Sequence, residues 1–195
     1  MSHSDRRKWN ARYAQGAYEA RTHPNELLRR WLPSLPVGRA LDIACGAGRK
    51  SLFLAAAGFH VDALDISNQA LTRAAAAANS RGLEVNWTEH DLDAGLPDGG
   101  RYDLIVMFRY VNMRIFGMLE ERLLPGGYLL VEEHLVSDAN VVGPRGSQYR
   151  VAPGALVAAA GNLEICHCDE SVLADPDGRQ VALARLVARK ATTGR

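Results

Sequence analysis

The chain has 195 residues, a length that favours a single domain. It carries 23 lysine and arginine residues against 22 aspartate and glutamate residues, and a formal charge of +1 argues against a dedicated nucleic-acid binder. Hydrophobic residues make up 47% of the chain, which is enough for a packed core. No apolar run follows the charged N-terminus, and no stretch approaches the roughly 20 apolar residues that span a bilayer, so we expect a cytoplasmic protein without a signal peptide.

Three cysteines, Cys45, Cys166 and Cys168, fit a reducing compartment. The segment Cys166-His167-Cys168 lacks four ligands at zinc spacing, so we expect no metal site. On an extended segment the two cysteines share one face and His167 takes the other. We therefore expect two buried thiols and an outward imidazole.

The first segment, residues 1–20, is polar with scattered aromatic side chains, and it is either a loose tail or a lid. Pro24 suits the first position of a helix that follows. Apolar residues at helical spacing support that helix: Leu27, Leu28, Trp31 and Leu32. Pro33 ends it.

From residue 39 onwards, buried strands alternate with helices. The pattern predicts strands at 40–44, 59–64, 83–89, 102–108 and 128–133, with helices at 49–57, 67–78 and 115–124 between them. A helix at 153–160 and strands at 163–168 and 180–188, joined by a turn at 175–178, complete the chain. This alternation predicts an α/β fold with a doubly wound, mostly parallel sheet and a C-terminal antiparallel hairpin.

The segment 41–48 reads as a strand, a glycine turn and the start of a helix. Glycine lets the backbone approach a ligand closely, and the amides of the helix N-terminus face that ligand. The third glycine of the dinucleotide fingerprint is absent, and Asp42 before the turn would repel a pyrophosphate. A sulfonium ligand with an α-amino group would instead be attracted. A tight turn without a ligand, or a nicotinamide-binding fold, remains an alternative.

Acidic residues end the next two predicted strands. Asp65 ends the second strand, where a carboxylate accepts both ribose hydroxyls in nucleotide-binding sheets. Asp91 ends the third strand, where it can accept from an adenine amino group. Leu124-Pro125-Gly126-Gly127-Tyr128 precedes the fifth strand. Each feature is weak alone, but their order along the chain is informative.

The order D-I-A-C-G-A-G, L-D-I-S, H-D-L, L-L-P-G-G resembles the class I S-adenosylmethionine-dependent methyltransferases over residues 38–135. The resemblance implies a seven-stranded sheet, and it implies that the cofactor S-adenosylmethionine lies across the ends of the first strands. It places the methionine end at Asp42 and the Gly46–Gly48 backbone, the ribose at Asp65, and the adenine at Asp91 and Leu92. Further cofactor contacts are expected at Ala44, Cys45, Ile66 and Phe108. Many members have glycine at the position of Ala44.

A narrower resemblance is to the tellurite-resistance (TehB-like) and thiopurine methyltransferase group. It rests on Trp9-Asn10-Ala11-Arg12-Tyr13, on the form D-I-A-C-G-A-G-R-K-S-L-F-L-A, and on the short chain. Tellurite methyltransferases of this group carry a His-Arg pair shortly before the last hairpin turn. Residues 170–174 contain neither residue, which argues against tellurite as the acceptor.

Candidate catalytic residues follow the fourth and fifth strands. Arg109 would face the methyl group by the resemblance, and it either holds an anionic acceptor or is structural. His134 is a possible base, or simply a polar strand end. The loop 143–150 is either a flap that binds the acceptor or a surface loop. The N/D-P-P-Y/F-type motif of amino-directed nucleic-acid methyltransferases is absent after the fourth strand.

These features predict one methyltransferase domain, with a tail or lid at 1–20, a cofactor core at 38–135, and an acceptor-side loop and hairpin at 136–195. The expected reaction transfers a methyl group to a small-molecule acceptor such as a thiol or a metalloid oxyanion. The expected partners are that acceptor and the cofactor, with no nucleic acid and no membrane. The alternatives are a methyltransferase for a larger acceptor and a non-catalytic module that binds S-adenosylmethionine.

Overall fold

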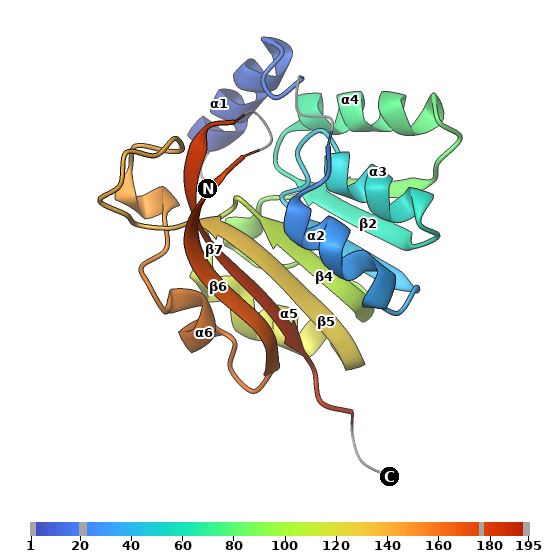
Figure 1. Cartoon of the computed structure of the whole chain (residues 1–195). Coiled ribbons are helices and arrows are strands. Elements are labelled where there is room, and N and C mark those ends of the chain that lie inside the picture. Colours follow the sequence, from blue (N-terminus) through green and yellow to red (C-terminus); the bar gives the residue numbers. More distant parts are fainter. Residues whose placement is uncertain (1–2, 20–22, 176–177, 193–195) are drawn as a thin grey trace.

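A seven-stranded sheet with the order β3-β2-β1-β4-β5-β7-β6 organises the chain. The computed structural model describes residues 3–19, 23–175 and 178–192 (Figure 1). The strands are β1 (Arg39–Ile43), β2 (His60–Asp65), β3 (Val85–Glu89), β4 (Tyr102–Phe108), β5 (Leu123–His134), β6 (Glu164–Ala174) and β7 (Gln180–Arg189). The first five are parallel, and β7 runs antiparallel to both β5 and β6. The predicted fold class, with its C-terminal antiparallel hairpin, is confirmed.

Helices cover both faces of the sheet. The helices are α1 (His3–Ala14), α2 (Glu26–Trp31), α3 (Arg49–Ala56), α4 (Asn68–Asn79), α5 (Phe116–Arg122) and α6 (Ala155–Ala159). Leu28, Leu54 and Leu71 bury α2, α3 and α4 in one apolar cluster. Leu119 and Leu156 bury α5 and α6 in a second cluster. Figure 1 shows α2 and α3 in front of the sheet and α5 behind it.

Strand β1 lies where the strand order changes direction. It pairs in parallel with β2 on one side and with β4 on the other. From β1 the chain first winds outward through β2 and β3, then returns to build β4 and β5. Ligands of doubly wound sheets bind at such a point, outside the carboxyl ends of the strands. We therefore expect a ligand site among the residues that follow β1, β2, β4 and β5.

Several boundaries differ from the predicted ones; β6, predicted at 163–168, runs on to Ala174. Residues 3–14 form a polar helix, with Asp5 in its first turn and Arg12 in its last, as the helix dipole favours. Pro24 precedes the N-cap Asn25 and so lies outside α2. Helix α5 ends at Arg122 because the next residue, Leu123, already pairs with Tyr102 in the sheet.

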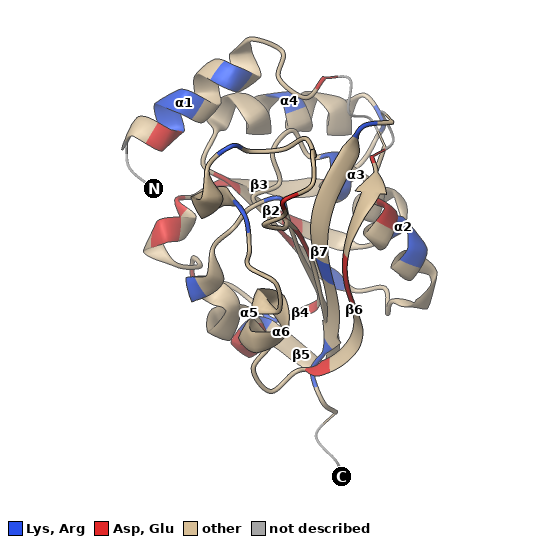
Figure 2. Ribbon diagram, turned by 60° about the vertical axis from the view of Figure 1, so that its left-hand side comes forward, with Lys and Arg blue, Asp and Glu red and all other residues tan. Residues whose placement is uncertain are grey.

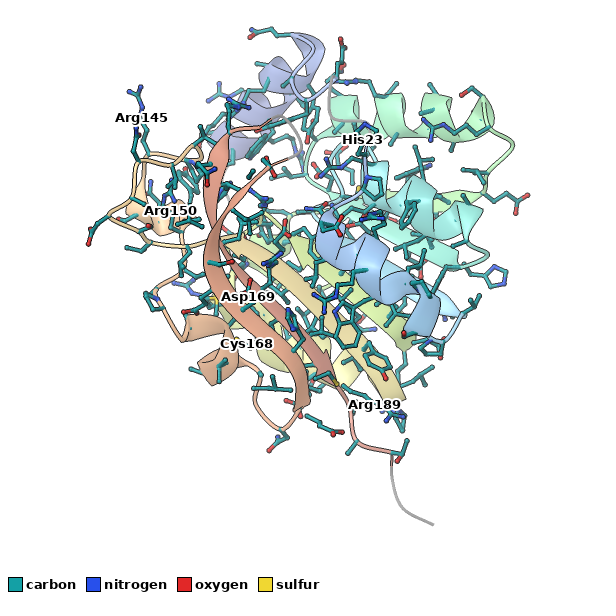
Figure 3. All side chains as sticks on the ribbon, in the orientation of Figure 1. His23, Arg145, Arg150, Cys168, Asp169 and Arg189 are labelled. Atoms are coloured by element: carbon teal, nitrogen blue, oxygen red, sulfur yellow. The ribbon has the colours of Figure 1, made fainter. Side chains whose placement is uncertain are left out.

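The cysteine prediction was wrong. Cys166 and Cys168 are exposed, and His167 is the half-buried member, with its ring centroid 6.2 Å from that of Trp31. The reason is that β6 is the edge strand and its register shifts between Ile165 and His167. Figure 3 shows Cys168 and Asp169 on this outer strand.

The predicted hairpin turn falls partly outside the described residues, which exclude 176 and 177. A hydrogen bond joins the two described ends of this turn: the Gly178 amide donates to the Asp175 carbonyl at 2.8 Å. In the described ranges, no helix combines the length and apolar character needed to cross a bilayer. The same ranges contain no group of three or more metal-ligating side chains.

The turn after β1 is tightly packed around Gly48. Its φ is +76°, and an added Cβ would lie 2.6 Å from Trp87 Cη2 and 2.8 Å from Ala74 Cβ. Gly82 has a similar φ of +63° with open space around it. We expect Gly82→Ala to cost about 1 kcal/mol through backbone strain alone, and Gly48→Ala to cost about 3 kcal/mol or more. Urea unfolding of both variants measures the difference; equal costs would show that the packing around Gly48 is not limiting.

Candidate active site

Asp65 joins the ends of β1 and β2 from a buried position. Its Oδ2 accepts from the Gly46 amide at 2.8 Å, and its Oδ1 accepts from the Ser67 amide at 2.8 Å. Burial raises the pKa of Asp65, and the Ser67 and Gly46 amides partly offset that effect. Each carboxylate oxygen can accept a second hydrogen bond, so the group is positioned to take two neighbouring hydroxyls.

The turn after β1 requires left-handed backbone at three positions. The φ angles are +52° at Ala44, +58° at Gly46 and +76° at Gly48. A Cβ at Gly46 would lie 2.4 Å from the Tyr13 hydroxyl. Cys45 is buried in the same turn, and its amide donates to the Leu64 carbonyl of β2 at 2.9 Å. The backbone of this turn is thus held against the end of β2, where Ile66 is also buried.

Asp42 has partners that sequence reasoning did not anticipate. It is fully buried, its Oδ2 accepts from the Ser51 hydroxyl at 2.7 Å, and its Oδ1 lies 3.2 Å from Lys50 Nζ. Burial raises the pKa of Asp42, and Lys50 and Ser51 oppose that rise. The predicted site for the methionine end therefore carries a cation beside its carboxylate.

Asp91 and Leu92 lie beside the loop that follows β4. Asp91 caps a short 3-10 helix, Leu92–Ala94, and its Oδ1 accepts from the Asp93 amide at 3.0 Å. Leu92 is buried, and its carbonyl accepts from the Asn112 amide group at 3.3 Å. Asn112 also contacts the Tyr110 hydroxyl at 3.3 Å. The structure thus brings the predicted adenine residues next to the loop after β4.

Arg109, a predicted catalytic residue, lies at the centre of a group of charged and polar side chains. It follows the buried Phe108 and has a φ of +61°, a conformation that is strained for a residue with a side chain. Its Nε donates to Glu132 Oε1 at 3.0 Å, and its Nη2 lies 3.6 Å from Asp175 Oδ1. Its Nη1 is 3.2 Å from His134 Nε2. The two predicted catalytic residues are therefore in contact, and two carboxylates already hold the guanidinium.

A chain of side-chain contacts extends from Arg109 toward α3. Glu132 Oε1 also accepts from Asn25 Nδ2 at 2.7 Å, and Asn25 Oδ1 accepts from Arg49 Nη2 at 2.9 Å. Sequence reasoning missed Asn25 and Asp175, because neither belongs to a recognisable motif. Only their contacts across the fold bring them to the site.

Glu133 has different contacts from its neighbour Glu132, because successive side chains of a strand point to opposite faces of the sheet. It is fully buried, its Oε1 accepts from the Tyr110 amide at 3.0 Å, and its Oε2 has no hydrogen-bond partner among the described residues. Burial raises the pKa of Glu133 well above its ordinary value, and the Tyr110 amide only partly offsets that rise. Burial therefore disfavours the charged form of Glu133 in the folded chain.

Helix α1 lies across the carboxyl ends of the first strands, beside α4 (Figure 1). Arg6 Nε is 3.1 Å from Glu89 Oε1 at the end of β3, and Asn10 Oδ1 accepts from the Ser67 hydroxyl at 2.7 Å after β2. Burial first, and then the Asp65 charge, raise the pKa of Tyr13, which packs over the glycine turn. The N-terminal segment thus contacts three strand ends in succession.

The loop between β5 and α6 approaches α1 from the other side. Lys8 Nζ is 3.5 Å from the Tyr149 hydroxyl and 5.3 Å from the centre of its ring. Arg150 holds the loop together by donating to the carbonyls of Pro144 and Leu135 at 3.0 and 2.9 Å. Figure 3 shows Arg145 pointing outward from this loop, and Figure 2 shows the basic residues along α1.

A cavity of about 490 Å³ lies at the opposite edge of the sheet. Its lining includes Pro36, Asp103, Tyr128 and Arg189, and Figure 3 shows Arg189 at that end. The Asp103 carboxylate already accepts from the Arg39 amide at 2.8 Å, and Arg189 stacks over Tyr128. The amino ends of parallel strands are not where doubly wound sheets bind ligands, so geometry favours the carboxyl edge despite this cavity.

Comparisons with known proteins agree with this fold. A family model described as a methyltransferase domain matches residues 40–127. The match to this methyltransferase domain model covers 88 of the 195 residues. Within this domain lie the glycine turn, Asp65, Asp91 and Arg109.

The relatives share the domain and differ in size. An uncharacterized protein of Mycobacterium tuberculosis is 40% identical over 68 residues, which cover 35% of this chain and 25% of the relative. The chain therefore spans a quarter of that relative's length. The crystal structure of TehB from Haemophilus influenzae has a TM-score of 0.74 at 23% identity, covering 92% of this chain and 66% of that chain. Magnesium protoporphyrin IX methyltransferase from Synechocystis, solved with bound SAM, has a TM-score of 0.61 at 20% identity, covering 83% and 76%.

The matched methyltransferase domain ends at Gly127, before most of β5. His134, the loop that carries Tyr149, and Asp175 all lie beyond it. The ends of β1 to β4 therefore lie within the matched stretch, and the groups that reach Arg109 from β5 and the hairpin lie outside it.

Replacing Glu132 or Glu133 of β5 by glutamine should change the stability of the folded chain in opposite directions. Because the folded-state pKa of Glu133 is raised, wild-type stability falls as pH rises above the ordinary value of 4.5. We expect Glu133→Gln to match the wild type at pH 5 and to gain on it by about 1 kcal/mol for each pH unit above that, up to the folded-state pKa.

Glu132→Gln is the control. Because Glu132 pairs with Arg109, this variant should be less stable than the wild type at pH 8. Urea unfolding at pH 5 and pH 8 measures both variants. A Glu133→Gln variant that loses stability at pH 8 as Glu132→Gln does would contradict a raised pKa of Glu133.

Proposed function

We propose that the chain binds S-adenosylmethionine at the carboxyl edge of β1, β2 and β4 and transfers its methyl group to a small-molecule acceptor. The observation that carries this proposal is the buried Asp65 carboxylate, held by the Gly46 and Ser67 amides beside a glycine turn. A family match over residues 40–127 supports the same cofactor.

The residues present fit that cofactor. Asp65 retains acceptor capacity for two ribose hydroxyls, and Asp91 with Leu92 stands where the adenine is expected. The turn at Gly46 leaves no room for a Cβ, because the Tyr13 hydroxyl lies 2.4 Å from the position that a Cβ would take. Ala44, Cys45 and Ile66 line the same turn, and Phe108 ends the neighbouring strand.

The bound cofactor would supply an electrophilic methyl group on a sulfonium. The protein then has to align the acceptor, exclude water and, for a protonated acceptor, take up a proton. His134 is the candidate proton acceptor, because it ends β5 beside Arg109, with its Nε2 3.2 Å from a guanidinium nitrogen. Arg109 orients this imidazole and ties it to Glu132 and Asp175.

The acceptor class that we propose is a small thiol, a metalloid oxyanion or a similar molecule. Of these, the contacts favour a thiol, because Arg109 is already paired with two carboxylates and offers an oxyanion little free charge. A thiol also carries the proton that His134 would take. We keep a larger acceptor as the alternative, and a cytoplasmic location remains a prediction from the sequence.

We further propose that α1 acts as a lid over the bound cofactor. The Arg6–Glu89 and Asn10–Ser67 contacts and the Tyr13 ring over Gly46 support this role.

Calorimetric titration with S-adenosylmethionine and S-adenosylhomocysteine tests the cofactor. We expect micromolar binding by the wild type and at least a tenfold loss in Asp65→Ala, since two charge-assisted hydrogen bonds to the ribose disappear. Asp62→Ala is the matched control, because Asp62 lies on the same strand but pairs with Arg39. Absence of binding in the wild type, or equal loss in both variants, would contradict the proposal.

Deleting residues 1–20 tests the lid. We expect the truncated chain to keep a cooperative thermal transition and to bind S-adenosylhomocysteine at least tenfold more weakly, because the covering contacts at three strand ends are gone. Calorimetry on the folded truncation measures the change, and unchanged affinity would rule out the lid.

A further inference from the structure

The surface where α1 meets the loop after β5 is basic. Helix α1 has cationic side chains at positions 6, 7, 8 and 12 and one acidic side chain, Asp5. The whole chain carries 23 cationic against 22 acidic residues, so this excess is local. Figure 2 shows the basic residues along α1 above the loop, which adds Arg145. A positive surface thus stands out in a chain that is close to neutral.

Lys8 and Arg145 are the cations of this surface that face each side of the contact. Both side chains are exposed, and Figure 3 shows Arg145 pointing outward. Lys8 Nζ lies 5.3 Å from the centre of the Tyr149 ring and 6.0 Å from that of Trp9. Within residues 3–19, 23–175 and 178–192, no ion pair joins Lys8 or Arg145 to an acid. Aromatic rings attract a cation without neutralising it, so both charges can still bind an anion.

The loop ties this surface to His134. At one end of the loop, a Cβ added to Gly143 would lie 2.9 Å from His134 Cε1. At the other end, the Val151 amide donates to the His134 carbonyl at 2.8 Å. Tyr149, whose hydroxyl is 3.5 Å from Lys8 Nζ, is two residues before Val151, at most about 7 Å of backbone. The contact with Lys8 is therefore close to the candidate proton acceptor.

Helix α1 ties the same surface to the glycine turn. The Tyr13 hydroxyl is 2.4 Å from the position that a Cβ would take at Gly46. Lys8 precedes Tyr13 by five residues of the same helix, about 7.5 Å along its axis. Lys8 thus lies between the turn proposed for the cofactor and the loop that rests on His134.

We infer that the methyl acceptor carries an anionic group apart from its nucleophilic atom, and that Lys8 and Arg145 bind this group. The inference rests on the proposed function and narrows the acceptor to an anionic thiol. Arg109 is not the anion site, because Glu132 and Asp175 already hold its guanidinium.

The thiol sulfur would form a bond to the methyl carbon as the sulfonium bond to that carbon breaks. The electron pair of the broken bond stays on the cofactor sulfur, which becomes a neutral thioether, and the thiol proton passes to His134.

Two thiols of nearly equal size test the inference: 6-mercaptohexanoate and its uncharged amide, 6-mercaptohexanamide. We expect kcat/KM for methyl transfer to be about fivefold higher for the carboxylate, the upper range for one exposed ion pair. Raising the salt from about 50 mM to about 500 mM should reduce this preference, because salt screens exposed charges. Lys8→Met should reduce it to less than about twofold, and Lys8→Arg should restore it, since the charge returns.

Arg30→Met is the control, because it removes an exposed cation of α2 and should keep the wild-type preference. The inference would be overturned by a wild type without a preference for the carboxylate, or by a Lys8→Met variant that keeps it. A wild type that binds S-adenosylhomocysteine and methylates neither thiol would overturn it as well. A wild type that does not bind S-adenosylhomocysteine would instead contradict the proposed function itself.

Discussion

The turn between β1 and α3 is the constraint on which the rest of the site depends. Three residues within five positions adopt left-handed backbone, which turns the chain sharply from a buried strand into a helix. The turn brings the Gly46 amide to Asp65 and leaves the first residues of α3 above Asp42. Without this geometry, the carboxylates that end β1 and β2 would be buried without adequate partners, at a considerable cost.

Around that turn the chain adds segments from distant parts of the sequence. Helix α1 contacts the ends of three strands, and the loop after β5 meets α1 at Lys8 and Tyr149. On the acceptor side, Arg109 joins β4 to β5 and to the hairpin through Glu132 and Asp175. The backbone at Arg109 is strained, and the contacts of the Arg109 side chain hold it in that conformation. The glycine turn and the group around Arg109 therefore belong to the same sheet.

Much of the fold could be predicted from local sequence. The strand Tyr102–Phe108 was predicted at its observed limits, and Ser67 caps α4 as expected by accepting from the Ala70 amide. The errors arose where tertiary contacts override local pattern. Leu123 follows a helical segment but pairs in the sheet, and Cys166 and Cys168 alternate like core residues although β6 is an edge strand.

Only those residues of the candidate site that belong to short sequence motifs could be predicted from the sequence. The glycine turn, Asp65 and Asp91 occur in motifs at strand ends, and the structure places them at one edge. Asn25 and Asp175 carry no motif, and only folding brings them to the group around Arg109. Lys50 did have a signal, since a lysine in the first turn of a helix opposes the helix dipole, but its burial could not be seen without the structure.

The central claim is that this chain binds its cofactor at the carboxyl edge of the sheet. The most direct measurement is amide chemical-shift mapping by NMR during titration with S-adenosylhomocysteine. The account predicts that the largest shifts cluster at residues 44–51, 65–67, 91–92 and 109–110, with smaller ones in α1. Shifts clustered instead around Pro36, Asp103 and Tyr128, at the cavity on the opposite edge, or no shifts at saturating ligand, would contradict it.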